Sequence, residues 1–279
     1  MNLERSAFSF VNRITSVSEG KRIRGSCAIP SQVGSFPLSL VGEAVGQLAA
    51  WAAMAAVDFQ QRPVAGLAGS VELLAEPRPG AVLDLSADLE NVDAESVEYS
   101  GTASVDGKPV IRLKDCVGPM MTLAEFDDPE KLRMRYAELC RNGAVPGGFP
   151  GLPELRFERT GGRDERSASA TFKVPCEAPF FADHFPRRPV FPGSLLIYVS
   201  LQLAGELAGE IPLPAAGRWV PGTIQDMKLR SFIPPGETLL LEAKLKQHSK
   251  ESASLAIQAR SSKEVVGTAG LLLKMEDGA

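Results

Sequence analysis

One histidine in this chain lies in a segment whose residue types could support proton transfer. His184 begins the run His-Phe-Pro-Arg-Arg-Pro-Val-Phe-Pro-Gly, which ends at Gly193 and leads into an apolar, helix-like stretch. An imidazole titrates near pH 7 and can act as a general base. A helix that starts at Gly193 would present free backbone N–H groups, which stabilise negative charge. The segment could therefore remove a proton and stabilise the resulting anion.

The helix that follows His184 is one of two copies. Residues 36–53 align with residues 191–208 without gaps, with eight identities in eighteen positions. A second block, 79–89 against 235–245, has six identities in eleven positions, at an offset one residue longer. Loops accept such a length change better than paired strands do. The chain is therefore predicted to be a tandem repeat of one domain.

The repeat supplies the acid that the His184 segment lacks. Glu43 of the first copy falls opposite Tyr198 of the second, and Ile29 falls opposite His184. If the two copies pair face to face, one complete site forms from His184 and Glu43. The other site would pair Ile29 with Tyr198 and be inactive.

Each copy is expected to bury one long helix against antiparallel strands. Apolar helices are predicted at 39–57 and from Gly193 onward, and a sheet can cover such a helix by curling around it. Asp106-Gly107 is a hairpin turn signal. The predicted strands are 7–17, 21–29, 81–89, 95–105 and 108–120 in the first copy, and 155–159, 167–174, 238–246, 252–260 and 264–275 in the second.

A helix and a loop are predicted to connect the copies. Asp127-Asp-Pro-Glu can open a helix that runs to about residue 141, and residues 142–151, rich in Pro and Gly, predict an irregular connector. The expected organisation is a first domain at 1–124, a helical and Pro/Gly-rich linker at 125–153, and a second domain at 154–279.

The segment 181–202 closely resembles the active-site stretch of beta-hydroxyacyl-(acyl carrier protein) dehydratases, a hot-dog-fold family that removes water from 3-hydroxyacyl thioesters. The shared pattern is His-Phe-Pro, two residues, Pro, two residues, Pro-Gly, and then Gln202 nine residues after Gly193. This resemblance implies an α+β double hot-dog fold, in which two tandem domains form a pseudo-dimer. Each domain would be an antiparallel sheet wrapped around a long central helix.

The resemblance also implies roles for individual residues. His184 would be the base that removes the α proton, and Glu43 the acid that protonates the leaving hydroxyl group. The backbone N–H of Gly193 would stabilise the thioester oxygen, and the Val190 carbonyl would accept a hydrogen bond from the imidazole. Tyr198 stands where the family has its acid, so it belongs to the lost second site.

Further positions are expected to support this site. The supporting positions are Gln47, Gln202 and Tyr198, with orienting and purely structural roles both open for the two glutamines. The acyl tunnel is expected to be lined by Leu40, Leu195 and Leu196. Contacts to a phosphopantetheine or an acidic carrier protein are expected from Arg187 and Arg188, although exposed arginines are also ordinary.

The net charge and the spacing of cysteines and motifs limit which ligands and partners are expected. The formal net charge of -4 gives no electrostatic support for nucleic-acid binding, and the four cysteines are scattered without CxxC spacing. No dinucleotide or P-loop motif is present, so no cofactor is expected, and no metal site is expected either. The apolar stretch 39–57 contains Glu43 and Gln47, which favours a buried core helix over a membrane span.

The sequence therefore predicts a cytoplasmic hydro-lyase that converts 3-hydroxyacyl thioesters to 2-enoyl thioesters in fatty acid or polyketide-type metabolism. The expected substrate is an acyl thioester on acyl carrier protein, with coenzyme A as the other option. Two alternatives stay open: a hot-dog acyl thioesterase, and a non-catalytic protein that binds acyl chains or carrier proteins. Acyl chain length, later isomerisation and association into a further homodimer also stay open.

Overall fold

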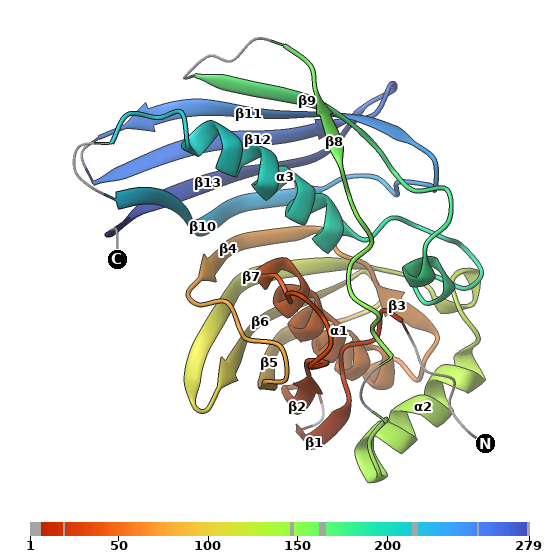
Figure 1. The fold of residues 1–279 in the computed structure, drawn as a ribbon. Coiled ribbons are helices and arrows are strands. Elements are labelled where there is room, and N and C mark those ends of the chain that lie inside the picture. The colour runs from red at the N-terminus through yellow and green to blue at the C-terminus, as the bar shows by residue number, and fades with distance from the viewer. Residues whose placement is uncertain are drawn as a thin grey trace.

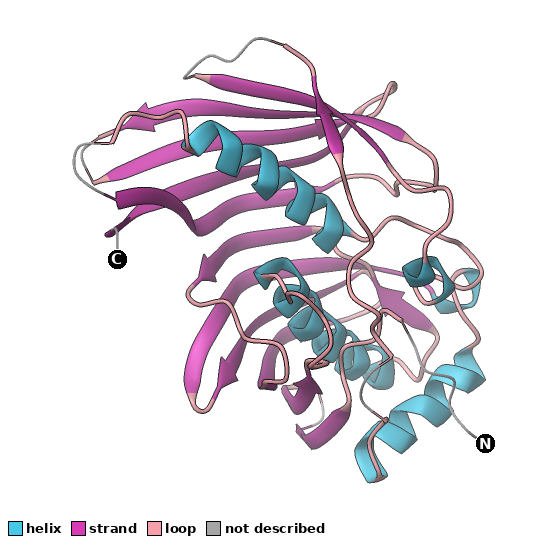
Figure 2. Ribbon diagram, viewed as in Figure 1, coloured by secondary structure: helices cyan, strands magenta, loops and turns pink. Residues whose placement is uncertain are grey.

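The computed structural model describes residues 7–18, 20–145, 148–161, 166–213, 217–249 and 251–277. They form two similar halves, each a curved antiparallel sheet around one long helix (Figures 1 and 2). The central helix is α1 (Leu38–Ala56) in the first half and α3 (Gly193–Ala208) in the second. The predicted architecture of one helix and one sheet in each copy is confirmed.

The strands of the two halves follow a similar order along the chain. β5 and β11 each have eleven residues and lie at the offset of the second aligned block. The first half contains β1 (Arg13–Ser18), β2 (Arg22–Ala28), β3 (Gln61–Pro63), β4 (Leu67–Leu73), β5 (Val82–Val92), β6 (Ser96–Val105) and β7 (Lys108–Thr122). The second contains β8 (Phe157–Arg159), β9 (Ser167–Lys173), β10 (Gly217–Leu229), β11 (Thr238–His248), β12 (Ser252–Arg260) and β13 (Val265–Asp277).

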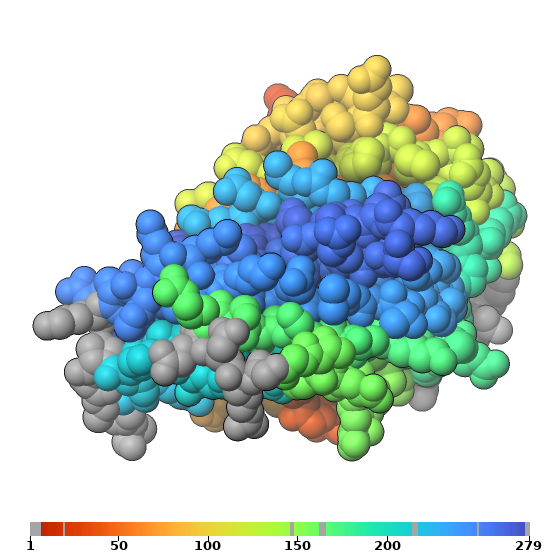
Figure 3. Space-filling model, turned by 90° about the horizontal axis from the view of Figure 1, so that it is seen from above, coloured from red at the N-terminus to blue at the C-terminus, as the bar shows by residue number. Residues whose placement is uncertain are grey.

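The two sheets are joined into one by antiparallel pairing of β4 with β10. The resulting order is β1-β2-β5-β6-β7-β4-β10-β13-β12-β11-β9-β8, with β3 paired to β7. Figure 1 shows β4 and β10 side by side between the halves. From above, the second half, in green to blue, covers most of the visible face and the first half borders it (Figure 3). The pairing of β4 with β10 therefore fixes how the two central helices face each other.

The central helices are buried within their own sheets. α1 packs against β2, β3, β5, β6 and β7, and α3 against β9, β10, β11 and β12. Among the helices of the described residues, α1 alone has the length and apolar composition of a membrane span. It is the core helix of the first half, and core helices commonly have this composition. The two helices also contact each other, so the space between them belongs to both halves.

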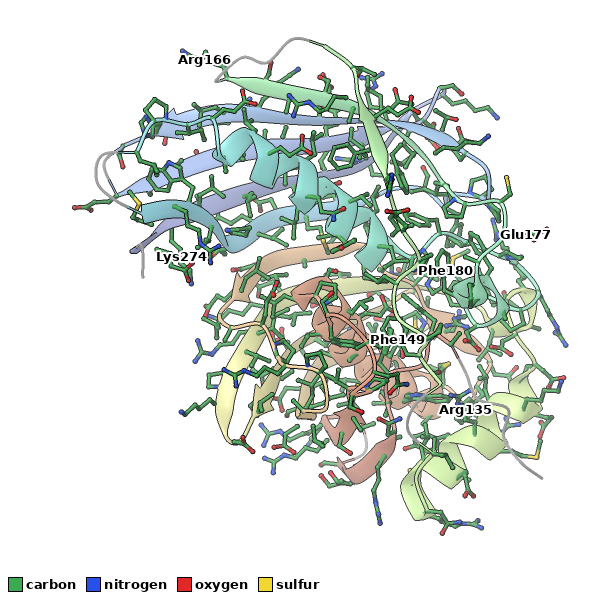
Figure 4. All side chains as sticks on the ribbon, viewed as in Figure 1. Arg135, Phe149, Arg166, Glu177, Phe180 and Lys274 are labelled. Carbon is green, nitrogen blue, oxygen red and sulfur yellow. The ribbon has the colours of Figure 1, made fainter. Side chains whose placement is uncertain are left out.

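The linker begins as predicted with a capped helix. η1 (Leu123–Glu125) is followed by α2 (Pro129–Arg141), and the Asp128 side chain accepts hydrogen bonds from the backbone N–H groups of Glu130 and Lys131. Beyond α2, Phe149 is buried with its ring 5.3 Å from that of Phe10 (Phe149 is labelled in Figure 4). Phe149 therefore anchors the far end of the linker against the first half.

Candidate active site

A long loop, residues 174–192, holds His184 between β9 and α3. Within it η2 (Pro179–Ala182) precedes the histidine, and His184 Nδ1 lies 2.9 Å from the Val190 carbonyl oxygen. The Val190 backbone N–H donates in return to the His184 carbonyl, also at 2.9 Å. A carbonyl oxygen can only accept, so Nδ1 carries the hydrogen and Nε2 is the basic nitrogen of the neutral ring. The predicted contact between His184 and Val190 is present.

Aromatic rings surround the imidazole and remove most of its hydration. The Phe185 ring stacks on it with centroids 4.0 Å apart, and the Phe8 ring approaches edge-on at 5.8 Å. This burial lowers the pKa of His184 from its ordinary value of 6.5, because the charged form loses solvation. The negative charge of Glu43 and the hydrogen bond to Val190 oppose that shift. His184 is therefore held as a neutral base with one free nitrogen.

Glu43 lies on α1 and is held by the glutamine one turn further along. Gln47 Nε2 donates to Glu43 Oε1 at 2.9 Å and to the Phe8 carbonyl at 3.0 Å. Gln47 Oε1 accepts from the Phe10 backbone N–H at 2.9 Å. Every one of these contacts uses a different hydrogen or oxygen of the amide. Gln47 therefore fixes the Glu43 carboxylate relative to the N-terminal segment.

That N-terminal segment also reaches the histidine loop. The Phe8 backbone N–H donates to Asp183 Oδ2 at 2.8 Å, directly before His184 in the chain. Phe8 thus links Gln47 of the first half with Asp183 of the second. The acid and the base come from different halves but share this connection.

One cavity of about 280 Å³ contains the site. It is lined from both halves, and its wall includes Glu43, Gln47, His184, Val190 and Gly193. On α1, the lining residues recur at the spacing of one helix face, with Gly42, Glu43, Gly46, Gln47 and Ala50 on it. The structure therefore brings the predicted acid and base, with Gln47, Val190 and Gly193, to one cavity.

Gly193 is the first residue of α3 and lines the cavity. Backbone N–H groups in the first turn of a helix have no acceptor within the helix, so they are available to a ligand. A Cβ atom at Gly193 would overlap the side chain of Leu229, which also lines the cavity. Close packing against Leu229 is a physical reason for glycine at this position.

The structure places one of the three predicted acyl-tunnel residues in the cavity wall. Leu196 lines the cavity, but Leu40 and Leu195 are fully buried and are not among its lining residues. Leu40 and Leu195 belong instead to the buried hydrophobic core. Other apolar side chains form the walls instead, among them Ile111, Leu113, Ile197, Ile224 and Met227.

Arg187 and Arg188 contact the linker. The Arg187 guanidinium donates to the Ala124 carbonyl at 2.9 Å and lies 3.6 Å from Asp128. Arg188 lies 3.6 Å from Glu125. Their side chains are still 48% and 45% exposed, so both remain accessible at the surface. Neither is among the residues that line the cavity.

Tyr198 and Gln202 lie in a separate place. They line a second cavity of about 450 Å³, together with residues 32–35 and 150–156. Gln202 Nε2 donates to the Tyr198 hydroxyl at 3.2 Å. The structure does not bring these two predicted supporting residues to His184. The second cavity is bordered by the linker and by the loop that precedes α1.

The expected match between Ile29 and His184 is wrong. The Ile29 backbone N–H bonds to the residue before β5, and that of Val174 bonds to the residue before β11, both at 2.9 Å. Ile29 therefore corresponds to Val174. The loop before α1 spans 29–37, while the loop before α3 spans 174–192. The loop before α3 is longer, and an ungapped alignment cannot account for its additional residues. That alignment therefore placed Ile29 opposite His184, although the first half has no counterpart of the segment that carries His184.

Two arginines, an aspartate and a tyrosine of the cavity were not predicted from the sequence. Arg62 on β3, Arg135 on α2, Asp127 and Tyr99 all line it. None belongs to the recognised motif or to the aligned repeat blocks. Arg62 stands alone between a helix and a strand, in Gln-Gln-Arg-Pro, and no local pattern distinguishes it from a surface arginine.

Comparisons with known proteins match this chain to dehydratases. Residues 160–268 match the ApeI-like family, described as ApeI dehydratase. The 3-hydroxyacyl-[acyl-carrier-protein] dehydratase FabZ of Thermus thermophilus is 32% identical over 108 residues, which cover 38% of this chain and 76% of that protein. FabZ of Pseudothermotoga lettingae is 32% identical over 125 residues, covering 44% of this chain and 86% of that protein.

Solved structures show the same fold along nearly the whole chain. A putative oleoyl thioesterase from Lactobacillus plantarum has a TM-score of 0.61 at 10% identity and covers 94% of this chain and 99% of its own. An acyl-ACP thioesterase from Bacteroides thetaiotaomicron has a TM-score of 0.54 at 14% identity and covers 92% of this chain and 100% of its own. At such low identity the likeness concerns the fold alone, which is a double hot-dog.

Proposed function

The chain belongs to the 3-hydroxyacyl-[acyl-carrier-protein] dehydratase family and is a hydro-lyase, and we propose that it works through one composite site per chain. Glu43 comes from a first domain at 1–124 and His184 from a second at 154–279, with 125–153 as the linker. The main support is the cavity that both side chains line.

In the proposed reaction, His184 Nε2 takes a proton from C2 of a 3-hydroxyacyl thioester. The electrons of that C–H bond form the C2–C3 double bond while the C3–O bond breaks. The departing hydroxyl group takes a proton from Glu43 and leaves as water. The products are a 2-enoyl thioester and water. His184 then releases its extra proton to solvent and Glu43 takes up a proton, which restores both groups for the next turnover.

The thioester oxygen gains negative charge as the C2 proton leaves. The backbone N–H of Gly193 is the proposed donor to it, since the start of α3 is open to the cavity. Leu196 would contact the acyl chain. Val190 would act through its carbonyl, which fixes the tautomer that leaves Nε2 basic.

The proposed substrates are carried by acyl carrier protein, with coenzyme A as the other carrier to test, in cytoplasmic fatty acid or polyketide-type metabolism. Arg187 and Arg188 are the proposed contacts for phosphopantetheine or for an acidic carrier. Their exposure and their loose pairing with acidic residues support this role, since each can exchange its partner for a phosphate.

The test is to incubate the protein with a short 3-hydroxyacyl thioester and to follow enoyl absorbance together with release of free thiol. His184→Ala and Glu43→Gln should each lower kcat by about 100-fold or more, because each removes a group that transfers a proton. Circular dichroism and thermal unfolding would establish that both variants fold.

Two exposed residues provide matched controls. His248 bonds only to the Pro212 carbonyl on the surface, and Glu206 on α3 pairs with Arg159. His248→Ala and Glu206→Gln should keep full activity. Retained activity in folded His184→Ala or Glu43→Gln would contradict the proposal. Thiol release without enoyl product would instead indicate a thioesterase, and binding without either product would indicate a non-catalytic protein.

A further inference from the structure

An arginine that the proposed dehydration does not use lies beside the proposed base. Arg62 lines the cavity from β3, and its guanidinium carbon is 3.9 Å from the centroid of the Phe185 ring. The same Phe185 ring stacks on the His184 imidazole at 4.0 Å. The guanidinium and the imidazole thus contact one ring. Arg62 and His184 therefore line the same cavity and pack against the same ring.

The charge of Arg62 is poorly compensated by the protein. Its nearest recorded carboxylate oxygen is Asp127 Oδ2 at 3.9 Å, at the outer limit of an ion pair. The Arg62 Nε atom is buried and has no hydrogen-bond partner among the described residues. The side chain is only 13% exposed, and burial lowers the pKa of Arg62 to about 10. A guanidinium normally satisfies such donors with a carboxylate or phosphate.

A second arginine has the same features in the same cavity. Arg135 on α2 lines it, and its Nε atom is also buried without a hydrogen-bond partner in the described part of the chain. Burial lowers the pKa of Arg135 and raises that of Asp127, which lies between the two arginines in electrostatic reach of both. Figure 4 labels Arg135, at the linker helix below the central helices. Asp127 thus interacts with both arginines. Glu43 also acts on Arg62, and Asp183 on Arg135, in both cases without a recorded ion pair in the described part of the chain.

A buried hydrogen-bond donor without a partner lowers the stability of the folded protein. Two such donors in one cavity therefore suggest that a bound ligand supplies their acceptors. We propose that Arg62 and Arg135 bind a carboxylate on the acyl group of the substrate. The substrate would then be a 3-hydroxyacyl thioester with a second acidic group, which rests on the proposed dehydratase function. A pantetheine phosphate fits less well, because a long arm separates it from the thioester, whereas Arg62 and His184 pack against the same Phe185 ring.

A binding experiment tests this without any turnover. Trp51 lines the cavity and the chain has only one other tryptophan, Trp219, so Trp219→Phe gives a fluorescence reporter at the site. The probes are the amide analogue of glutaryl-pantetheine, in which NH replaces sulfur, and its uncharged methyl ester. The parent should bind the free acid at least about tenfold more tightly than the ester. Equal affinities for the two probes would overturn the proposal.

Substitutions test whether the two arginines cause the tighter binding of the free acid than of its methyl ester. Arg62→Met and Arg135→Met should each lose most of the preference for the acid, and Arg62→Lys should keep part of it. Arg22→Met, which removes an exposed arginine paired with Asp88 on the outer strands, should leave it unchanged. A preference that survives both methionine substitutions would contradict the assignment.

The unfolding temperature and the enoyl-forming activity distinguish a ligand-binding role of the arginines from a structural one. If the arginines bind ligand, Arg62→Met should unfold at the same temperature as the parent or higher, since it removes an under-paired buried charge. A lower unfolding temperature without loss of the acid preference would show a structural role instead. Failure of enoyl formation with the acid preference intact would overturn the dehydratase function and leave the carboxylate site standing.

Discussion

Gln47 donates a hydrogen bond to Glu43 from one helical turn further along α1, at 2.9 Å. The same amide bonds to the backbone of Phe8 and of Phe10, so the acid is tied to a segment far away in the chain. Phe8 in turn bonds to Asp183 beside the base. The positions of acid and base are therefore coupled through backbone groups.

Replacement of Gln47 by Ala should reduce both stability and activity. It would leave the Phe10 N–H and the Phe8 carbonyl without a partner, which costs about 1–3 kcal/mol for each such buried group. Glu43 would lose its orienting contact, so kcat should fall by about tenfold, or roughly 1.4 kcal/mol of barrier. Chemical denaturation and enoyl formation measure the two effects.

Gln202 is the matched control for that substitution, because it occupies the same repeat position. Its recorded hydrogen bond within the described residues is to Tyr198, in the second cavity. Gln202→Ala should change stability by about 0.5 kcal/mol or less and leave kcat unchanged. Equal effects of the two substitutions would mean that the orienting contact of Gln47 has no special role.

The pH profile of the reaction should reflect the lowered pKa of His184. The base must be neutral to accept a proton, so kcat/KM should rise with pH along a limb whose midpoint is below 6.5. The positive charge of Arg62 contributes to that lowering. Arg62→Met should therefore move the limb to higher pH, whereas Arg22→Met should not. A midpoint above 6.5 in the parent would contradict the burial effect.

Stability should depend on pH through the same residue. In the unfolded chain His184 has its ordinary pKa of 6.5, and in the folded protein the pKa is lower. Between these two values the unfolded chain binds more protons, so stability falls as pH decreases through that window, by up to about 1.4 kcal/mol per unit. Above pH 6.5 the contribution is complete.

Thermal unfolding of the parent and of His184→Gln at several pH values measures that contribution. The parent should lose more stability than the variant between pH 7 and pH 5. A greater loss in the variant would mean that the charge of Glu43 outweighs burial and raises the pKa of His184.

Gly193→Ala should lower activity more than stability. The added methyl group would overlap Leu229 and push that side chain, which lines the cavity, from its place. We expect kcat/KM to fall by about tenfold with the fold retained. The double variant Gly193→Ala/Leu229→Ala should recover part of the activity, because the space for the methyl group is then available. No recovery would point to an effect on the helix start itself.

Much of the fold could be predicted because local signals and the repeat agree. The Asp128 cap starts α2 at Pro129, and Asp106 and Gly107 have the positive φ values, 49° and 75°, of a tight hairpin turn. The helix positions that carry Glu43 and Gln47 follow from the aligned repeat.

The strands that join the halves were missed because their sequences are weak. β4 contains Gly69, and β10 contains Pro221 and Gly222, residues that normally interrupt strands. Their pairing depends on how the two halves dock, which no local pattern records. The same applies to Arg62, whose place beside Phe185 is set entirely by contacts between the halves.

The antiparallel pairing of β4 with β10 has a consequence for how the site responds to dilution. A site shared between two separate chains is lost when the protein concentration falls below the dissociation constant of the dimer. Here both contributing halves belong to one polypeptide and are held by one continuous hydrogen-bonded sheet. The site proposed at Glu43 and His184 should therefore keep the same activity per chain from micromolar to picomolar protein.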